Sequence, residues 1–249
     1  MANPITCCWT VPRTVSTSFE RMVIERGDHV VFDEPYSRSY YFGPEQRSNR
    51  YPVRGKEHSA AAVTEELLGA AERAPVFVKD MAYQAIDLVD HDLIAGWRHC
   101  FLIRHPAATI RSLGGVWPDF TDDETGWAAL GRMADLVADA GHPLVVMESE
   151  RLCADPAGVV AAWCAAIGLE FDADALTWEP GMQPQWELWP EWHASSSTAT
   201  GFRPLPDERT LPADAPPRWH DAFADALGVH TRLAAHTLDP LDPTPRSRF

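Results

Sequence analysis

The chain has 249 residues, of which 45% are hydrophobic and 23% charged, and its formal net charge at pH 7 is −15. These values fit a globular protein with one sizeable α/β core or two small ones, and the negative charge argues against a surface for nucleic acids or anionic membranes. No stretch approaches the roughly twenty apolar residues of a membrane span.

Strand-like and helix-like patterns alternate through the first two thirds of the chain. Strands are predicted over residues 5–11, 29–33, 75–79, 98–103 and 143–147, and helices over residues 17–27, 59–73, 84–95, 106–115, 125–140, 155–167 and 218–236. The continuous apolar runs at 76–78 and 144–147 are typical of parallel strands covered on both faces. The alternation predicts an α/β fold with a mostly parallel, doubly wound central sheet flanked by helices. Ligands of such folds lie beyond the C-terminal ends of the strands.

Two stretches interrupt this alternation. Residues 34–56 are aromatic, polar and irregular, and residues 178–217 contain four tryptophans, several prolines and a hydroxyl run at 195–198. Long irregular segments in a compact domain are usually binding loops or lids. An extended surface segment whose tryptophans fill a secondary core is the alternative.

The chain shows no internal repeat and no convincing linker, so we expect a single domain over residues 1–249 with a frayed tail over 239–249. Its N-terminus lacks the basic start and long apolar run of a secretory signal. The odd number of cysteines, without a CxxC pair, predicts buried free thiols and a cytoplasmic location. These cysteines are Cys7, Cys8, Cys100, Cys153 and Cys164.

The first strand leads directly into the segment Pro12-Arg13-Thr14-Val15-Ser16-Thr17-Ser18 and then into a helical pattern. A strand that turns into a helix presents free backbone N–H groups and the positive end of the helix dipole to a ligand. Charge from Arg13, together with the hydroxyls at 16–18, could therefore surround a phosphate. Simple capping by a Ser/Thr-rich helix start is the alternative. The segment lacks the GxxxxGK sequence of an ordinary ATP- or GTP-binding loop.

A second turn of the same kind follows the strand at 98–103. It begins with Arg104-His105-Pro106, and Ser112 lies eight residues after Arg104. Two such turns predict a ligand with two separate anionic ends.

Together these turns resemble the sulfotransferase family that uses 3′-phosphoadenosine 5′-phosphosulfate (PAPS), in a divergent bacterial-type branch. In that family, a proline, a basic residue, a hydroxyl residue, a glycine and two more hydroxyl residues bind the 5′-phosphosulfate, and a later RxPxxxxxS element binds the 3′-phosphate. Matches to the first element are Pro12, Arg13, Thr14, Ser16 and Thr17, and matches to the second are Arg104, Pro106 and Ser112. The resemblance covers residues 5–115 well and the remainder loosely.

The resemblance implies a P-loop-like sulfotransferase fold that binds PAPS as donor and releases 3′-phosphoadenosine 5′-phosphate (PAP). The 5′ site would consist of Arg13, Thr14, Ser16, Thr17 and Ser18, and the 3′ site of Arg104 and Ser112, with residues 195–203 as cover. Val15 stands where the family has glycine, and a β-branched residue adopts positive φ only at a cost. We expect the loop to follow a slightly different path there rather than to have lost the 5′ site.

The same resemblance suggests three catalytic residues. Lys79, at the end of the third strand, would bind the bridging or sulfuryl oxygens, and Arg13 would also stabilise the leaving group. Alternatively, Lys79 only pairs with Asp80 from the strand end. Glu34 would be the general base, because several branches carry a glutamate after the second strand and partial desolvation raises the pKa of a carboxyl group.

Glu34 could equally be a loop carboxylate or a helix-cap partner, and the other candidate bases are Asp80, His58 and His193. The common branch of the family has a histidine where this chain has Met81. No sequence pattern indicates a metal site.

The sequence therefore predicts a metal-independent, PAPS-dependent sulfotransferase that modifies a hydroxyl or amine of a small-molecule acceptor. The alternatives are a non-catalytic nucleotide-binding module and a kinase-like phosphotransferase that uses ATP.

Overall fold

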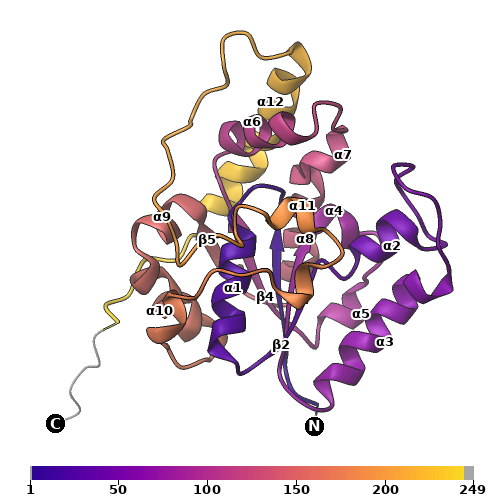
Figure 1. Cartoon of the computed structure of the whole chain (residues 1–249), viewed down its shortest axis with the longest axis vertical. Helices are drawn as coiled ribbons and strands as arrows, with labels where there is room; N and C mark the ends of the chain where they lie inside the picture. The colour runs from indigo at the N-terminus through magenta and orange to yellow at the C-terminus, as the bar shows by residue number, and fades with distance from the viewer. Residues whose placement is uncertain (1, 244–249) are drawn as a thin grey trace.

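The computed structural model describes residues 2–243 and contains a five-stranded sheet (Figure 1). Its strands are β1 (Ile5–Thr10), β2 (Val30–Asp33), β3 (Val76–Met81), β4 (Arg98–Ile103) and β5 (Val146–Glu148). Every neighbouring pair is parallel, in the order β2-β3-β1-β4-β5. The predicted α/β fold with a parallel sheet is thus confirmed. The chain crosses from one side of β1 to the other between β3 and β4, which is where a ligand-binding crevice is expected in such sheets.

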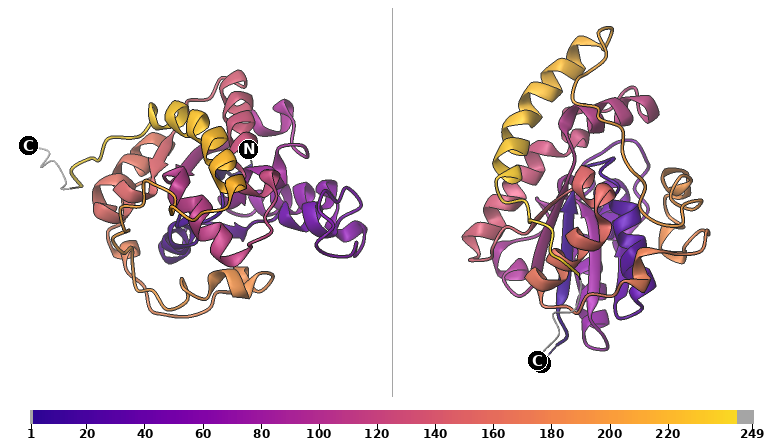
Figure 2. Two further views of the ribbon diagram at one scale, coloured as in Figure 1. Left: turned by 90° about the horizontal axis from the view of Figure 1, so that it is seen from above. Right: turned by 90° about the vertical axis from the view of Figure 1, so that its left-hand side faces the viewer.

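Helices cover both faces of this sheet, as the right-hand view of Figure 2 shows. They are α1 (Ser16–Arg26), α2 (Ser37–Phe42), α3 (Ala60–Ala71), α4 (Ala82–Ala85), α5 (His91–Ile94), α6 (Pro106–Val116), α7 (Asp122–Thr125), α8 (Trp127–Asp139), α9 (Ser149–Ala154), α10 (Pro156–Ile167), α11 (Pro190–His193) and α12 (Pro217–Ala234). Three short 3-10 turns, η1 (Lys56–His58), η2 (Asp174–Leu176) and η3 (Pro184–Trp186), join them. No helix within residues 2–243 is both long enough and apolar enough to cross a membrane.

Side chains of the strands alternate between two apolar cores, one under each helical layer. In β1, Cys7 and Trp9 belong to the core shared with α8 and α12, whereas Cys8 belongs to the core shared with α1 and α10. All five cysteines are buried and unpaired, as the sequence predicts.

Two predicted helices are interrupted. The pattern at 84–95 is not one helix, because α4 ends at Ala85 and the chain turns before α5. Asp90 has an extended backbone and caps α5 by accepting a hydrogen bond from the Leu93 N–H at 2.8 Å. The pattern at 125–140 is divided by Gly126, whose left-handed backbone (φ 78°) separates α7 from α8.

The irregular segment 178–217, orange in Figure 1, passes in front of α1 and carries the short helix α11. A backbone hydrogen bond from the Trp178 N–H to the Thr200 oxygen (3.2 Å) holds the two ends of its first half together. Within the tail predicted to be frayed, the Leu241 N–H donates to the Gly158 oxygen at 3.0 Å. Residues 244–249 of that predicted tail lie outside the described residues.

Candidate functional site

A cavity of about 280 Å³ opens at the C-terminal ends of β1, β2, β3 and β4. The two turns singled out in the sequence meet at this cavity, although about ninety residues separate them. All eight predicted site residues outside the strands line it, namely Arg13, Thr14, Ser16, Thr17, Ser18, Glu34, Arg104 and Ser112. Lys79 is not among the lining residues.

The turn between β1 and α1 has a strained backbone. Both Arg13 (φ 71°) and Val15 (φ 57°) are left-handed, a conformation that costs a β-branched residue about 1–2 kcal/mol. The expected change of path is therefore not seen at Val15, which adopts the region that glycine would favour. Its side chain packs against the core beneath α1, and this contact helps to hold the strained conformation. The turn thus still aims the first N–H groups of α1 at the cavity.

Hydroxyl groups beneath the turn fix its position. Thr14 is fully buried, and its hydroxyl donates to the Val11 oxygen (3.1 Å) and contacts the Thr10 hydroxyl. Sequence reasoning missed Ser149, at the start of α9, whose hydroxyl contacts the Thr14 oxygen (2.6 Å) and the Ile103 oxygen (2.9 Å). Ser149 thereby ties the first turn to the end of β4. The Thr14 side chain stabilises the turn instead of facing a ligand.

The two turns are also joined through their arginines. The Arg104 Nη1 donates to the backbone oxygen of Arg13 (3.2 Å), and the Arg13 Nε donates to the Ser112 hydroxyl (2.9 Å). Burial, and then the positive charge of Arg104, lower the pKa of Arg13. Two guanidinium groups that repel each other beside a helix N-terminus create a positive potential, which a bound anion would relieve.

One carboxylate already contacts part of this positive region. Glu208 lies 3.3 Å from the Arg104 Nη2 through one oxygen and 3.3 Å from the Arg111 Nη1 through the other. It comes from the irregular segment before α12, and no local sequence pattern indicates that it would reach Arg104.

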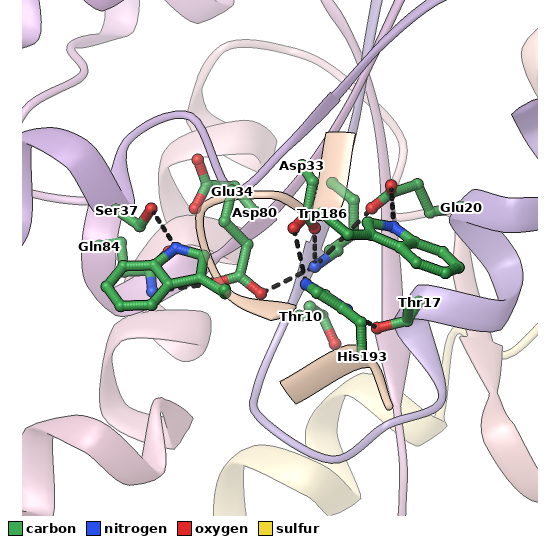
Figure 3. A network of polar contacts seen from close by, with 12 residues as sticks. Thr10, Thr17, Glu20, Asp33, Glu34, Ser37, Asp80, Gln84, Trp186 and His193 are labelled. Carbon is green, nitrogen blue, oxygen red and sulfur yellow. Dashed lines mark hydrogen bonds and ion pairs between the residues drawn. The ribbon is translucent and has the colours of Figure 1, made fainter. Parts of the chain in front are cut away.

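Lys79 is fully buried among carboxylates instead of facing the cavity. Figure 3 shows these carboxylates, which belong to Glu20, Asp33 and Glu34. Its Nζ contacts Asp33, lies 2.7 Å from the Glu34 Oε1 and 3.8 Å from the Glu20 Oε2. Burial by itself would lower the pKa of Lys79, but the carboxylates of Asp33, Glu34 and Glu20 raise it well above its usual value. The ion-pair partners of Lys79 are therefore these carboxylates and not the Asp80 that the alternative named.

Glu34 occupies the position expected of a base at the cavity. Its backbone is left-handed (φ 45°), its N–H donates to the Lys79 oxygen at 2.7 Å, and its side chain is 13% exposed. The Gln84 Nε2 donates to the Glu34 Oε2 at 3.1 Å. Lys79 and Gln84 therefore hold one carboxylate oxygen each, and the carboxylate still borders the cavity.

The other candidate bases have different surroundings. Asp80 is buried and accepts a hydrogen bond from the Tyr36 N–H (2.9 Å), and burial raises its pKa. Neither Asp80 nor His58 lines the cavity, whereas His193 does. The His193 ring lies between the Thr17 hydroxyl and the Asp33 carboxylate, as Figure 3 shows.

The remaining wall of the cavity is aromatic. Trp117 and Trp192 meet edge to face with ring centroids 4.6 Å apart, and the hydroxyls of Tyr41 and Tyr83 are 2.9 Å apart. The tryptophan-rich segment contributes side chains both to the cavity wall and to the core. Trp189 and Trp192 line the cavity, while Trp178 and Trp186 are buried in packed cores. Residues from the stretch 195–203 also border it.

Comparison with known proteins gives a consistent match. A family model described as a sulfotransferase domain matches residues 5–233. Two solved structures each match 94% of this chain. The sulfotransferase domain from the Synechococcus PCC 7002 olefin synthase has a TM-score of 0.56 and 15% identity, and 96% of that chain is covered. The sulfotransferase domain from the curacin biosynthetic pathway has a TM-score of 0.50 and 12% identity, and 98% of that chain is covered. At such low identity these structures show a shared fold.

Two curated relatives come from Arabidopsis thaliana. Branched-chain-amino-acid aminotransferase-like protein 2 is 24% identical over 232 residues, and branched-chain-amino-acid aminotransferase-like protein 1 is 26% identical over 245 residues. The alignments cover 92% and 95% of this chain but only 41% and 43% of the relatives, so the chain spans less than half of their length.

Proposed function

The chain belongs to the sulfotransferase domain family, and from that premise we propose that it transfers a sulfuryl group from PAPS to a hydroxyl or amine of a small-molecule acceptor. One observation carries the proposal. The paired guanidinium groups of Arg13 and Arg104, beside the start of α1, share a single cavity with the Glu34 carboxylate.

The positive end of this cavity suits a donor with two anionic ends. Backbone N–H groups at the start of α1, with Arg13 and the hydroxyls of Ser16, Thr17 and Ser18, would hold the 5′-phosphosulfate. Arg104 and Ser112 would hold the 3′-phosphate, and Arg111 is close enough to Glu208 to share that region. The donor supplies an activated sulfuryl group, and the residues around it supply position and charge.

We assign Glu34 as the general base that removes the proton of the acceptor. Its carboxylate borders both the aromatic wall, where an acceptor would lie, and the anion-binding turns. Lys79 acts through Glu34 as a positioning residue, because it contacts this carboxylate and not the cavity. Arg13 remains the residue placed to stabilise negative charge on the departing phosphate.

The test is a transfer assay that measures PAP released from PAPS with a panel of alcohols, phenols and amines. Glu34→Gln should lower kcat by about 100-fold or more, because a missing general base costs about that factor. Its affinity for PAP should stay within about threefold of the wild type, since the amide keeps the shape of the side chain. Glu65→Gln, an exposed change in α3, serves as the matched control and should turn over normally.

Two outcomes would contradict the proposal. Normal turnover by Glu34→Gln would place the base elsewhere. Tight binding of PAP without transfer to any acceptor would favour a nucleotide-binding module without catalysis.

A further inference from the structure

His193 connects the anion-binding turn to the buried carboxylate cluster, and the proposed chemistry does not yet use it. Its Nδ1 lies 3.3 Å from the Thr17 hydroxyl oxygen, and its Nε2 lies 3.0 Å from the Asp33 Oδ2. The ring is almost fully buried and stacks on Trp186, with centroids 5.1 Å apart and planes 20° apart. In Figure 3 the His193 ring points toward Thr17 on one side and Asp33 on the other.

Asp33 is an ionised partner for this ring. Burial favours the neutral acid, but the charges of Lys79 and His193 outweigh it and hold the pKa of Asp33 well below its usual value. A carboxylate beside Nε2 requires a hydrogen on that nitrogen. The Nε2 and Asp33 Oδ2 atoms are close, but their alignment is poor for a hydrogen bond.

The role of Nδ1 then depends on the charge of the ring. In a neutral His193 with hydrogen on Nε2, Nδ1 can only accept, so the Thr17 hydroxyl must point its hydrogen at the ring. In a protonated His193, Nδ1–H donates to the Thr17 oxygen. The hydroxyl hydrogen of Thr17 is then free to point toward the start of α1, where an anion would bind.

We propose that His193 is a proton-coupled positioning residue, which takes up a proton together with the anion and thereby turns the Thr17 hydroxyl toward that anion. The proposal rests on the proposed function only in identifying the anion as the 5′ end of the donor. The step balances, because one proton from solvent binds Nδ1 and the existing Thr17 hydrogen bond reverses its direction.

The charges around His193 can accommodate a positive ring. The ionisable groups from the packed elements are Glu20 of α1, Asp33 of β2, Glu34 directly after β2, and Lys79 of β3. Burial, and then the neighbouring Asp33, raise the pKa of Glu20 well above its usual value, which favours its neutral form. Two carboxylates against one ammonium leave one negative charge in excess, which an imidazolium would balance. From the first turn, Arg13 lies over the ring of Trp192, next to His193 in the chain.

Nitrogen NMR of the protein with labelled histidine tests this coupling. The His193 signal, identified by its loss in His193→Gln or by through-bond correlation in the wild type, is followed from about pH 5 to about pH 9. Three samples are compared: no anion, saturating sodium sulfate, and saturating PAP. We expect the pH at which His193 gains its proton to rise by about one unit with either anion. By linkage, the affinity of the protein for the anion should then fall by up to about tenfold as the pH rises.

Variants at Thr17 separate the relay from simple charge attraction. Thr17→Ser keeps the hydroxyl and should keep the shift, whereas Thr17→Val keeps the shape and should lose most of it. A shift of equal size in Thr17→Val would overturn the relay, and so would no shift with either anion in the wild type. The exposed His91 supplies an internal control signal that should not respond.

The proposal and the proposed function can fail separately. A shift with sulfate from a protein that does not bind PAP would sustain the coupling and reject the donor. Binding of PAP without a shift would keep the donor and reject the coupling.

Discussion

Replacing Arg104 with alanine should weaken the binding of PAP, by an amount that two opposing contacts determine. The Arg104 side chain is only 9% exposed, so its contact with a phosphate would be a charged hydrogen bond worth about 1.5–3 kcal/mol. In the free protein Arg104 contacts Glu208, which is 21% exposed, and binding must first break that contact at a cost of about 0.5–1 kcal/mol. The difference between these two free energies predicts that Arg104→Ala loses about 1–2 kcal/mol of binding free energy for PAP, which is about 5- to 30-fold in affinity.

Glu208→Gln tests the second contact alone. It removes the competing charge from Arg104 and Arg111, so PAP should bind about 2- to 5-fold more tightly. Calorimetric titration measures both variants, and Arg132→Ala, an exposed arginine that pairs with Asp87, should bind like the wild type. Unchanged affinity in Arg104→Ala, or weaker binding by Glu208→Gln, would refute the assignment of this region to the 3′-phosphate.

Three further predictions concern stability, measured by urea unfolding. Because Val15 is left-handed, Val15→Gly should be more stable than Val15→Ala by about 1 kcal/mol, the reverse of the usual order in helices. Lys79→Met leaves the buried Asp33 carboxylate without its ammonium partner and should cost about 3–5 kcal/mol near neutral pH, a loss of stability that becomes smaller at acidic pH as Asp33 of the variant becomes protonated. Burial lowers the pKa of His99 to about 4. Folding therefore loses up to about 3 kcal/mol as the pH falls from about 6.5 to about 4, and His99→Gln should flatten this dependence.

A specific result would contradict each of these three stability predictions. Greater stability of the alanine variant would show that Val15 is not strained. If the difference in stability between the wild type and Lys79→Met stayed constant with pH, an unpaired carboxylate charge would not be its cause. An unchanged pH slope in His99→Gln would assign the loss to other groups.

The local pattern of strand, turn and helix predicts both turns that we propose bind the donor, because each turn depends on neighbouring residues. Arg13 and Arg104 follow β1 and β4, and parallel pairing of these strands brings their C-terminal ends together. Such a pairing follows from the alternation of strands and helices, so the meeting of the two turns could be anticipated.

The environment of Lys79 depends on register, which the sequence pattern alone does not specify. In the sheet, Lys79 of β3 lies beside Asp33 of β2. Both predicted strands end at these residues, at 33 and 79, and aligning the two ends in parallel would have indicated the ion pair. Lys79 does not pair with Asp80, because adjacent residues of a strand point to opposite faces of the sheet.

The sequence contains no comparable pattern that would predict the contacts made by irregular segments. Glu208 is 104 positions from Arg104, and His193 is 176 positions from Thr17. Their positions follow from how residues 178–217 pack across the finished sheet. Only the aromatic and hydroxyl composition of that segment indicated that it would matter for binding.

If one cavity binds both anionic ends of PAPS, its affinity for a nucleotide must depend on the 3′-phosphate, and calorimetry with three nucleotides measures this dependence. PAP and AMP are titrated in EDTA, and ATP is then titrated with Mg²⁺. The 3′-phosphate distinguishes PAP from AMP, so PAP should bind at least about fivefold more tightly, because the charged contact with Arg104 contributes about 1–2 kcal/mol after the contact with Glu208 is broken. Equal affinity for AMP, or a preference for ATP with Mg²⁺, would contradict the proposed donor site.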